Sequence, residues 1–101
     1  MAWYVYLFNF FAGALFANGI PHFIHGISGK KFRTPFAKPG GESSPVINVV
    51  WGVVNFLVGY ALLFGIGNFV LGFNRSAQMI ALGFVVMAVL LSISFGRVRG
   101  R

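Results

Sequence analysis

The sequence predicts an all-α membrane protein with three transmembrane helices, and two observations lead to this class. First, 57% of the 101 residues are hydrophobic, only 9% are charged, and the mean hydropathy is +0.82. So few charged residues cannot cover a water-exposed surface, so lipid must be the solvent for most of the chain. Second, polar segments separate three apolar runs, each about as long as the ~18 residues that indicate a span. We expect one domain over residues 1–101, with spans at about 2–25, 45–66 and 77–96.

The first apolar run, residues 2–20, contains no charged side chain. At about 1.5 Å per residue, this run alone is near the lower limit for crossing a hydrocarbon core of roughly 30 Å. Continuation past Pro21 towards Ile27 supplies the missing length, although a proline inside a helix favours a kink or an end. No basic residues precede the run, so we expect it to be retained rather than cleaved as a signal peptide.

The second and third spans have recognisable starting signals. Ser44 precedes Pro45, which places a capping hydroxyl directly before a residue suited to the first helical position. The third span follows Asn74-Arg75-Ser76, in which we expect Ser76 to cap the helix. Gly96 and the arginines after it end this span.

The loop at residues 28–44, rich in proline and glycine, joins the first two spans and carries much of the positive charge. Seven of the eight Lys and Arg residues lie in this loop or in the C-terminal tail: Lys30, Lys31, Arg33, Lys38, Arg97, Arg99 and Arg101. Three spans put the loop and the tail on the same side, and the positive-inside rule makes that side cytoplasmic. The N-terminus is then outside, with Trp3, Tyr4 and Tyr6 as an aromatic anchor.

Each span carries small and amide side chains at helical spacing, and we expect them to form the helix-packing interface. They are Asn9, Gly13 and Ala17 in the first span, Asn48, Gly52, Asn55 and Gly59 in the second, and Ala77, Ala81, Ala88 and Ser92 in the third. An alternative interpretation is that Asn9 and Asn55 line a pore or a ligand cleft.

The aromatic and basic residues of the loop are expected to contact lipid headgroups or a partner protein. These residues are Lys30, Lys31, Phe32, Arg33, Phe36 and Lys38. Near an anionic surface each charge contributes about 1 kcal/mol, so we expect the four charges to be roughly interchangeable. The alternative is a specific docking site, in which Arg33 would dominate through a bidentate pair. The basic residues form no stripe or groove, so no nucleic acid is expected as a partner.

Few residues could carry chemistry. His22 and His25 lie three residues apart and would share a helical face, but the single carboxylate side chain is Glu42. These three residues are weak candidates for metal ligands, and we expect neither a metal nor a cofactor. The spans contain no Asp, Glu, Lys or Arg, and the chain shows no nucleophile–base pair or phosphate-binding loop. We therefore expect no enzymatic activity.

The pattern of residues 18–26 (NGIPHFIHG), 34–37 (TPFA) and 43–52 (SSPVINVVWG) resembles a group of short, uncharacterised bacterial inner-membrane proteins. The resemblance covers about the first 60 residues. It implies a bacterial origin and a multi-pass protein of the inner (cytoplasmic) membrane, and it transfers no activity and no site residues.

Three functional hypotheses follow from these features. The leading one is a non-catalytic accessory subunit that braces or seals a lipid-facing surface of a larger inner-membrane complex, in a respiratory or photosynthetic setting. Its partners would be other integral membrane subunits and anionic lipid headgroups. The second is a homo-oligomeric pore or carrier for a neutral or anionic solute, with Asn9, Asn48 and Asn55 at the lumen. The third is a redox subunit that binds a cofactor through His22 or His25.

The charge distribution generates a prediction about orientation. A reporter fused to the C-terminus should be active only in its cytoplasmic form, because seven of the eight basic residues lie on that side. Neutralising Lys30, Lys31 and Arg33 together should produce a mixed orientation, since three of those seven charges are removed. A C-terminal reporter that is active only in the periplasm would contradict the assignment.

Overall fold

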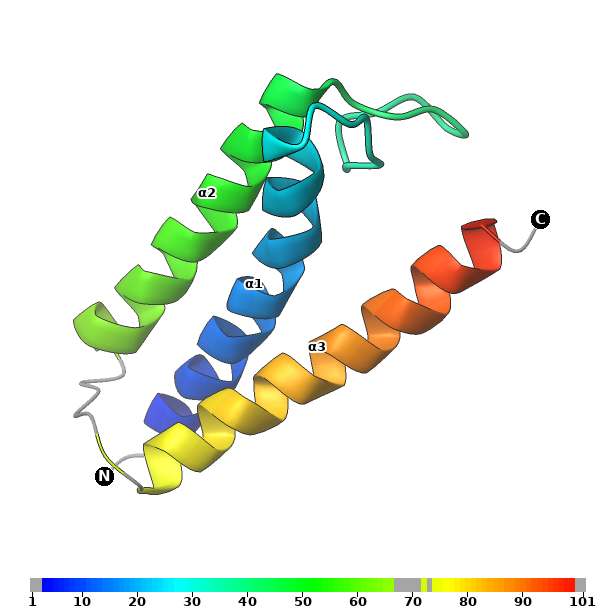
Figure 1. Ribbon diagram of the computed structural model, residues 1–101. Helices are drawn as coiled ribbons and strands as arrows, with labels where there is room; N and C mark the ends of the chain where they lie inside the picture. The colour runs from blue at the N-terminus through cyan, green and yellow to red at the C-terminus, as the bar shows by residue number, and fades with distance from the viewer. Residues whose placement is uncertain (1–2, 67–71, 73, 100–101) are drawn as a thin grey trace.

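The computed structural model describes residues 3–66, 72 and 74–99, and this part of the chain is helical apart from the loop and links (Figure 1). Helix α1 is Trp3–Ile27, α2 is Pro45–Ala61, the π-helix η1 is Leu62–Ile66, and α3 is Arg75–Arg99. Three helical segments are long and apolar enough to cross a membrane, which confirms the all-helical class with three candidate spans. Residue 2, where the first span was predicted to begin, and Arg101 lie outside the described residues.

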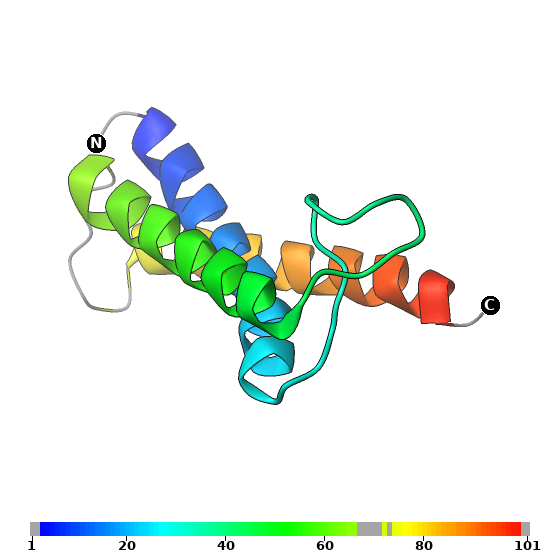
Figure 2. The ribbon, with the colours of Figure 1, turned by 90° about the horizontal axis from the view of Figure 1, so that it is seen from above.

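Helix α1 is the centre of the fold. It packs against both α2 and α3, whereas α2 and α3 do not contact each other within the described part of the chain. The two outer helices therefore sit on different sides of α1, and α3 diverges from the α1–α2 pair (Figures 1 and 2). The loop at residues 28–44 and the C-terminal end of α3 share one end of the molecule, opposite the N-terminus (Figure 1). The basic residues of the loop and Arg97 are thus gathered at one end.

Pro21 does not end the first helix, which continues to Ile27. The residues on either side of the proline are packed against α2: a Cβ on Gly19 would lie 2.9 Å from Gly52 O, and a Cβ on Gly26 would lie 2.7 Å from Pro45 O. These contacts hold both halves of α1 on one partner helix, so the loss of a single backbone hydrogen bond at Pro21 does not break it.

One predicted cap is confirmed and the other is wrong. Ser44 caps α2, because the Ile47 amide donates to Ser44 Oγ at 3.2 Å and Pro45 occupies the first turn. At the start of α3 the Ala77 amide donates to Asn74 Oδ1 at 2.9 Å, so Asn74 is the cap. Ser76 instead lies inside the first turn and is buried. Asparagine competes well for the cap position because its side-chain oxygen reaches the amide three residues along.

The residues predicted for packing on α1 and α2 are buried, but those predicted on α3 are not. Asn9, Gly13, Ala17, Asn48, Gly52, Asn55 and Gly59 are all buried. By contrast, Ala81, Ala88 and Ser92 are exposed. The contact between α3 and α1 lies instead at Gly83, where a Cβ would collide with Phe10 O, and at Gly13, where it would collide with Ile80 O. Glycine permits the closer backbone approach, so the crossing point forms at Gly83 rather than along the alanines.

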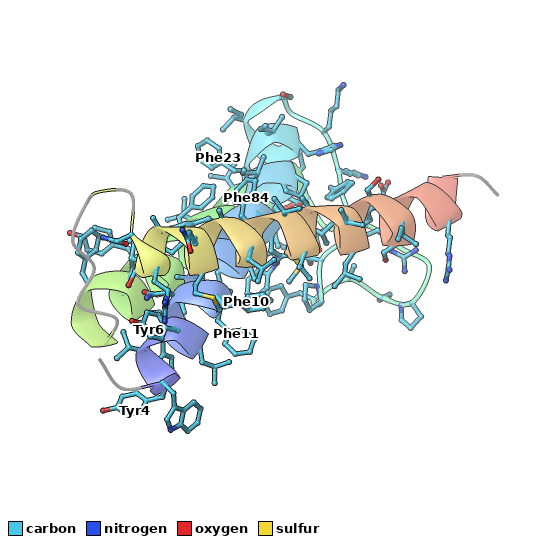
Figure 3. All side chains as sticks on the ribbon, turned by 90° about the horizontal axis from the view of Figure 1, so that it is seen from below. Tyr4, Tyr6, Phe10, Phe11, Phe23 and Phe84 are labelled. Carbon is cyan, nitrogen blue, oxygen red and sulfur yellow. The ribbon has the colours of Figure 1, made fainter. Side chains whose placement is uncertain are left out.

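Most of the apolar surface of α2 and α3 faces outwards. In the best apolar window of α3 only 6% of the residues are buried inside the chain, compared with 39% in α1. The exposed residues include Val50, Leu57, Val85, Val89 and Leu90. In water such a large apolar surface would favour aggregation, whereas lipid or another membrane protein covers it without a free-energy penalty. Tyr4 and Tyr6 lie at the N-terminal end of α1, and Tyr4 and Trp3 are exposed there (Figure 3).

The crossing of α1 and α3 generates a prediction. Gly83→Ala should destabilise the packing of α3 on α1 by about 1–3 kcal/mol, because the added methyl overlaps backbone that cannot move aside. Gly96→Ala is the matched control in the same helix, since a Cβ there meets nothing within 4 Å. Unfolding in mild detergent, followed by circular dichroism, measures both. Equal stability of the two variants would contradict the assigned crossing point.

Candidate functional site

A polar cluster joins α1, the loop and the start of α2, and the Asn48 amide lies at its centre. Asn48 Nδ2 donates to the carbonyl oxygens of Phe32, Ser43 and Ser44 at 3.0, 3.2 and 3.0 Å. Phe32 and Ser43 also pair through their backbones, with N–O distances of 3.2 and 2.8 Å. The loop is therefore closed by an antiparallel bridge, and one fully buried side chain of α2 holds both sides of that bridge.

These bonds determine the tautomer of neutral His22. Because Asn48 Nδ2 is occupied by carbonyl oxygens, Asn48 Oδ1 is the acceptor for His22 Nδ1–H at 3.0 Å. The proton of the neutral imidazole is thus on Nδ1, and Nε2 carries the lone pair. Nε2 has no hydrogen-bond partner among the described residues. Although His22 is only 3% exposed, this nitrogen keeps an unused acceptor position.

Phe32 is buried, which corrects the expectation that it contacts lipid or a partner. Its ring is 4% exposed and stacks on His25 at a centroid distance of 4.0 Å, with Phe95 of α3 at 4.6 Å on another side. The bridge to Ser43 turns the Phe32 ring inwards, where it connects α1 to α3. Phe36 is 66% exposed and remains available to lipid, although its ring also meets the edge of Trp51.

A second pair of amides lies deeper along the helices. Asn18 Nδ2 donates to Asn55 Oδ1 at 2.9 Å, and Asn55 Nδ2 donates to Trp51 O at 2.8 Å. Asn9 differs, since both of its amide atoms are buried without a partner among the described residues. Asn9, Asn48 and Asn55 are each at most 2% exposed, so they point into the protomer. This burial argues against the hypothesis in which these three asparagines line a lumen between copies of the chain.

A small cavity with polar side chains among aromatic ones, called the polar cavity below, adjoins the cluster and has a volume of about 240 Å³. Its walls include Asn18, His22, Arg33, Thr34, Trp51 and Phe95. They come from α1, the loop, α2 and α3, so that every part of the fold contributes. Arg33 is half-buried here, whereas Lys30, Lys31 and Lys38 are exposed. The four loop charges expected to act alike are therefore in different environments.

The two histidines and Glu42 do not form a metal site. Across the described residues, no group of three or more His, Cys, Asp or Glu side chains lies close enough to hold a metal ion. His25 Nδ1–H donates to Pro21 O at 2.7 Å, while His22 Nδ1 is used by Asn48. Each histidine thus uses one ring nitrogen for a hydrogen bond that holds the end of α1 and the loop in place.

Sequence reasoning missed four residues. Asn18, Trp51 and Phe95 line the cavity, and Gly83 forms the crossing that holds α3 against α1. Asn18 and Trp51 lie within the distinctive segments 18–26 and 43–52, but nothing in their spacing marks them as cavity residues.

Comparison with protein-family models, with curated proteins and with solved structures gave no match for this chain. The support for a function therefore comes from the geometry of the chain itself.

Asn48 and Asn9 provide a matched pair for a stability prediction. Both are completely buried, but one is fully hydrogen-bonded and the other has no partner among the described residues. Asn48→Leu should cost about 2–4 kcal/mol, because it leaves His22 Nδ1–H buried without its acceptor and removes the side-chain donor from three carbonyls, which keep only backbone N–H partners. Asn9→Leu should be neutral or stabilising by about 1 kcal/mol, because an unpaired amide is replaced by an apolar group of similar size. Equal losses of stability on denaturation in detergent would contradict the different roles assigned to the two amides.

Proposed function

We propose that this chain is a small, non-catalytic accessory subunit of a larger bacterial inner-membrane complex, respiratory or photosynthetic in kind. In this proposal the basic loop and the C-terminus face the cytoplasm, and the apolar helices brace or seal a surface of the partner. The polar cluster at the cytoplasmic end then has a structural role, because its hydrogen bonds fix the loop to the helices.

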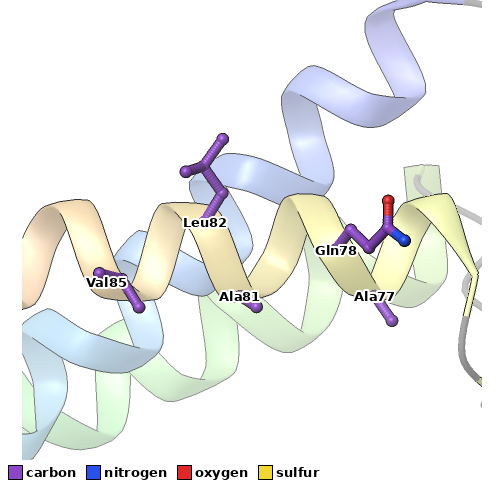
Figure 4. A pocket seen from close by; sticks show the side chains of 5 residues that line it. All are labelled: Ala77, Gln78, Ala81, Leu82 and Val85. Carbon is purple, nitrogen blue, oxygen red and sulfur yellow. The ribbon is translucent and has the colours of Figure 1, made fainter.

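The observation that carries the proposal is the unused face of α3. The chain packs α3 through Gly83 and leaves the alanine stripe of this helix exposed. This stripe borders two apolar hollows. One contains Ala77 and Ala81 with Val85 in a row along one edge of α3 (Figure 4). The other lies between α1 and α3 and includes Ala88 and Ser92, so the partner helix is placed on the first hollow, at Ala77 and Ala81.

Small side chains on an open face favour a second helix over lipid chains. Where a helix presents alanine and serine, a neighbouring backbone approaches closely and gains packing that disordered acyl chains do not match. Helix α2 does not reach this face. A transmembrane helix of an integral partner subunit therefore fits the stripe better than any described element of the chain itself.

Co-purification from native membranes tests the proposal. In mild detergent the chain should elute with a defined set of larger membrane proteins, and Ala81→Trp should abolish this association, because the indole fills the space that the partner helix needs. Val86→Trp is the control. At 3.6 residues per turn, Val86 lies on a different side of α3, and it is also exposed.

Two outcomes would contradict the proposal. A wild-type chain that elutes as a monomer or homo-oligomer, with nothing else present, would remove the accessory-subunit hypothesis. Equal effects of the tryptophans at positions 81 and 86 would show that the alanine stripe is not the contact surface.

A further inference from the structure

The polar cavity and the apolar groove between α1 and α3 meet at one side chain. Phe95 lines both of them. His22 lines the polar cavity, and its neighbour Pro21 lines the groove, whose volume is about 370 Å³. A molecule with a small polar head and an apolar chain could therefore occupy both spaces at once, passing the Phe95 ring.

The polar cavity offers three different recognition groups. Arg33 supplies a cation. Trp51 supplies an indole N–H that is buried without an acceptor among the described residues. His22 supplies the lone pair of Nε2, because its Nδ1 proton is given to Asn48. The described residues that line the cavity include no carboxylate. This set suits a ligand that carries an anionic oxygen and, next to it, a hydroxyl donor.

The depth of the cavity suits the headgroup region of a bilayer. His22 lies five residues before the end of α1, and Trp51 lies six residues after the start of α2. At about 1.5 Å per residue, both are roughly 7–9 Å from the basic end of the helices. When the helix ends are at the membrane surface, this depth is the inner edge of the headgroup region, which is roughly 5–7 Å thick on each side, so the glycerol of a phospholipid lies beside the cavity.

We propose that the cavity and the groove bind one molecule of an anionic, hydroxylated phospholipid, of which phosphatidylglycerol is the simplest. Its phosphate pairs with Arg33 and, after a shift of the buried indole towards the cavity, accepts from Trp51 Nε1–H. A headgroup hydroxyl donates to His22 Nε2, and one acyl chain lies in the groove between Pro21 and Ala88.

The alternative phospholipids fit less well. Phosphatidylcholine has no headgroup donor for His22 Nε2. Phosphatidylethanolamine has a donor, but its ammonium group would lie next to Arg33 and near the three exposed lysines of the loop. Charge complementarity therefore selects the anionic lipid. This inference rests on the membrane placement in the proposed function, but not on the existence of a protein partner.

The experiment uses the full chain, purified in mild detergent and incubated with equal amounts of phosphatidylglycerol and phosphatidylcholine. Native mass spectrometry counts the lipids that remain bound. The wild-type chain should retain one phosphatidylglycerol. Arg33→Ala should weaken its retention by roughly tenfold or more, as expected for the loss of a charge-assisted hydrogen bond. Lys31→Ala, which removes the same charge from an exposed position, should change retention by less than about twofold.

Two milder variants keep the test decisive if Arg33→Ala fails to fold, which circular dichroism would reveal. Trp51→Phe keeps the ring and removes the indole N–H, and it should weaken retention by roughly threefold to tenfold. Arg33→Lys keeps the charge but lacks the planar fork, so it should restore only part of the binding.

Several results would overturn the inference. These are equal retention of the two lipids, equal effects of the Arg33 and Lys31 variants, and unchanged retention in both Arg33→Lys and Trp51→Phe. Displacement of the lipid by millimolar inorganic phosphate would also overturn it, because the site would then recognise a free anion. A separate vesicle-flotation assay distinguishes the two proposals. A chain that inserts without lipid preference removes only the lipid site, whereas a chain that does not insert removes the proposed function as well.

Discussion

The Asn48 side chain is the interaction on which the charged end of the molecule depends. Its amide reaches both strands of the loop bridge and the imidazole of α1, so three segments distant in sequence are fixed by one residue. In an apolar environment these bonds have no water to compete with them, and leaving any of their partners unpaired is costly. The position of the loop, the tautomer of His22 and the inward turn of Phe32 all follow from this one amide.

The rest of the fold is constrained by α1, which has to serve two neighbours that do not meet within the described part of the chain. It presents Gly19 and Gly26 to α2 and Gly13 to α3. Helix α1 is packed on two sides, whereas α2 and α3 each keep an open side. This asymmetry explains why the burial of apolar residues is concentrated in α1 although all three helices are apolar. The same asymmetry leaves most of the exposed apolar surface on the outer helices.

Sequence reasoning predicted the features that depend on composition and local pattern. The three spans follow from long uncharged runs, and the Ser44 cap follows from its position before Pro45. The choice between Asn74 and Ser76 as the cap of α3 failed, because both residue types suit the position. The burial of Phe32 was missed because an aromatic residue between two basic residues, Lys31 and Arg33, is typical of a headgroup-binding segment. Only the bridge to Ser43, which joins residues eleven positions apart, turns that ring inwards.

The candidate cavity could not have been predicted, because it depends on the arrangement of four segments rather than on a motif. Arg33 comes close to Trp51 and Phe95 only after the loop has folded back over the ends of the helices (Figure 2). The four charges of the loop are therefore in different environments. Arg33 is half-buried near His22 and Trp51, whereas Lys30, Lys31 and Lys38 are exposed. Exposed charges provide long-range attraction to an anionic surface, which salt screens, whereas a sheltered guanidinium recognises a specific oxygen. In the proposed lipid site the basic loop thus has two separate roles, general attraction through its lysines and selective binding through its arginine.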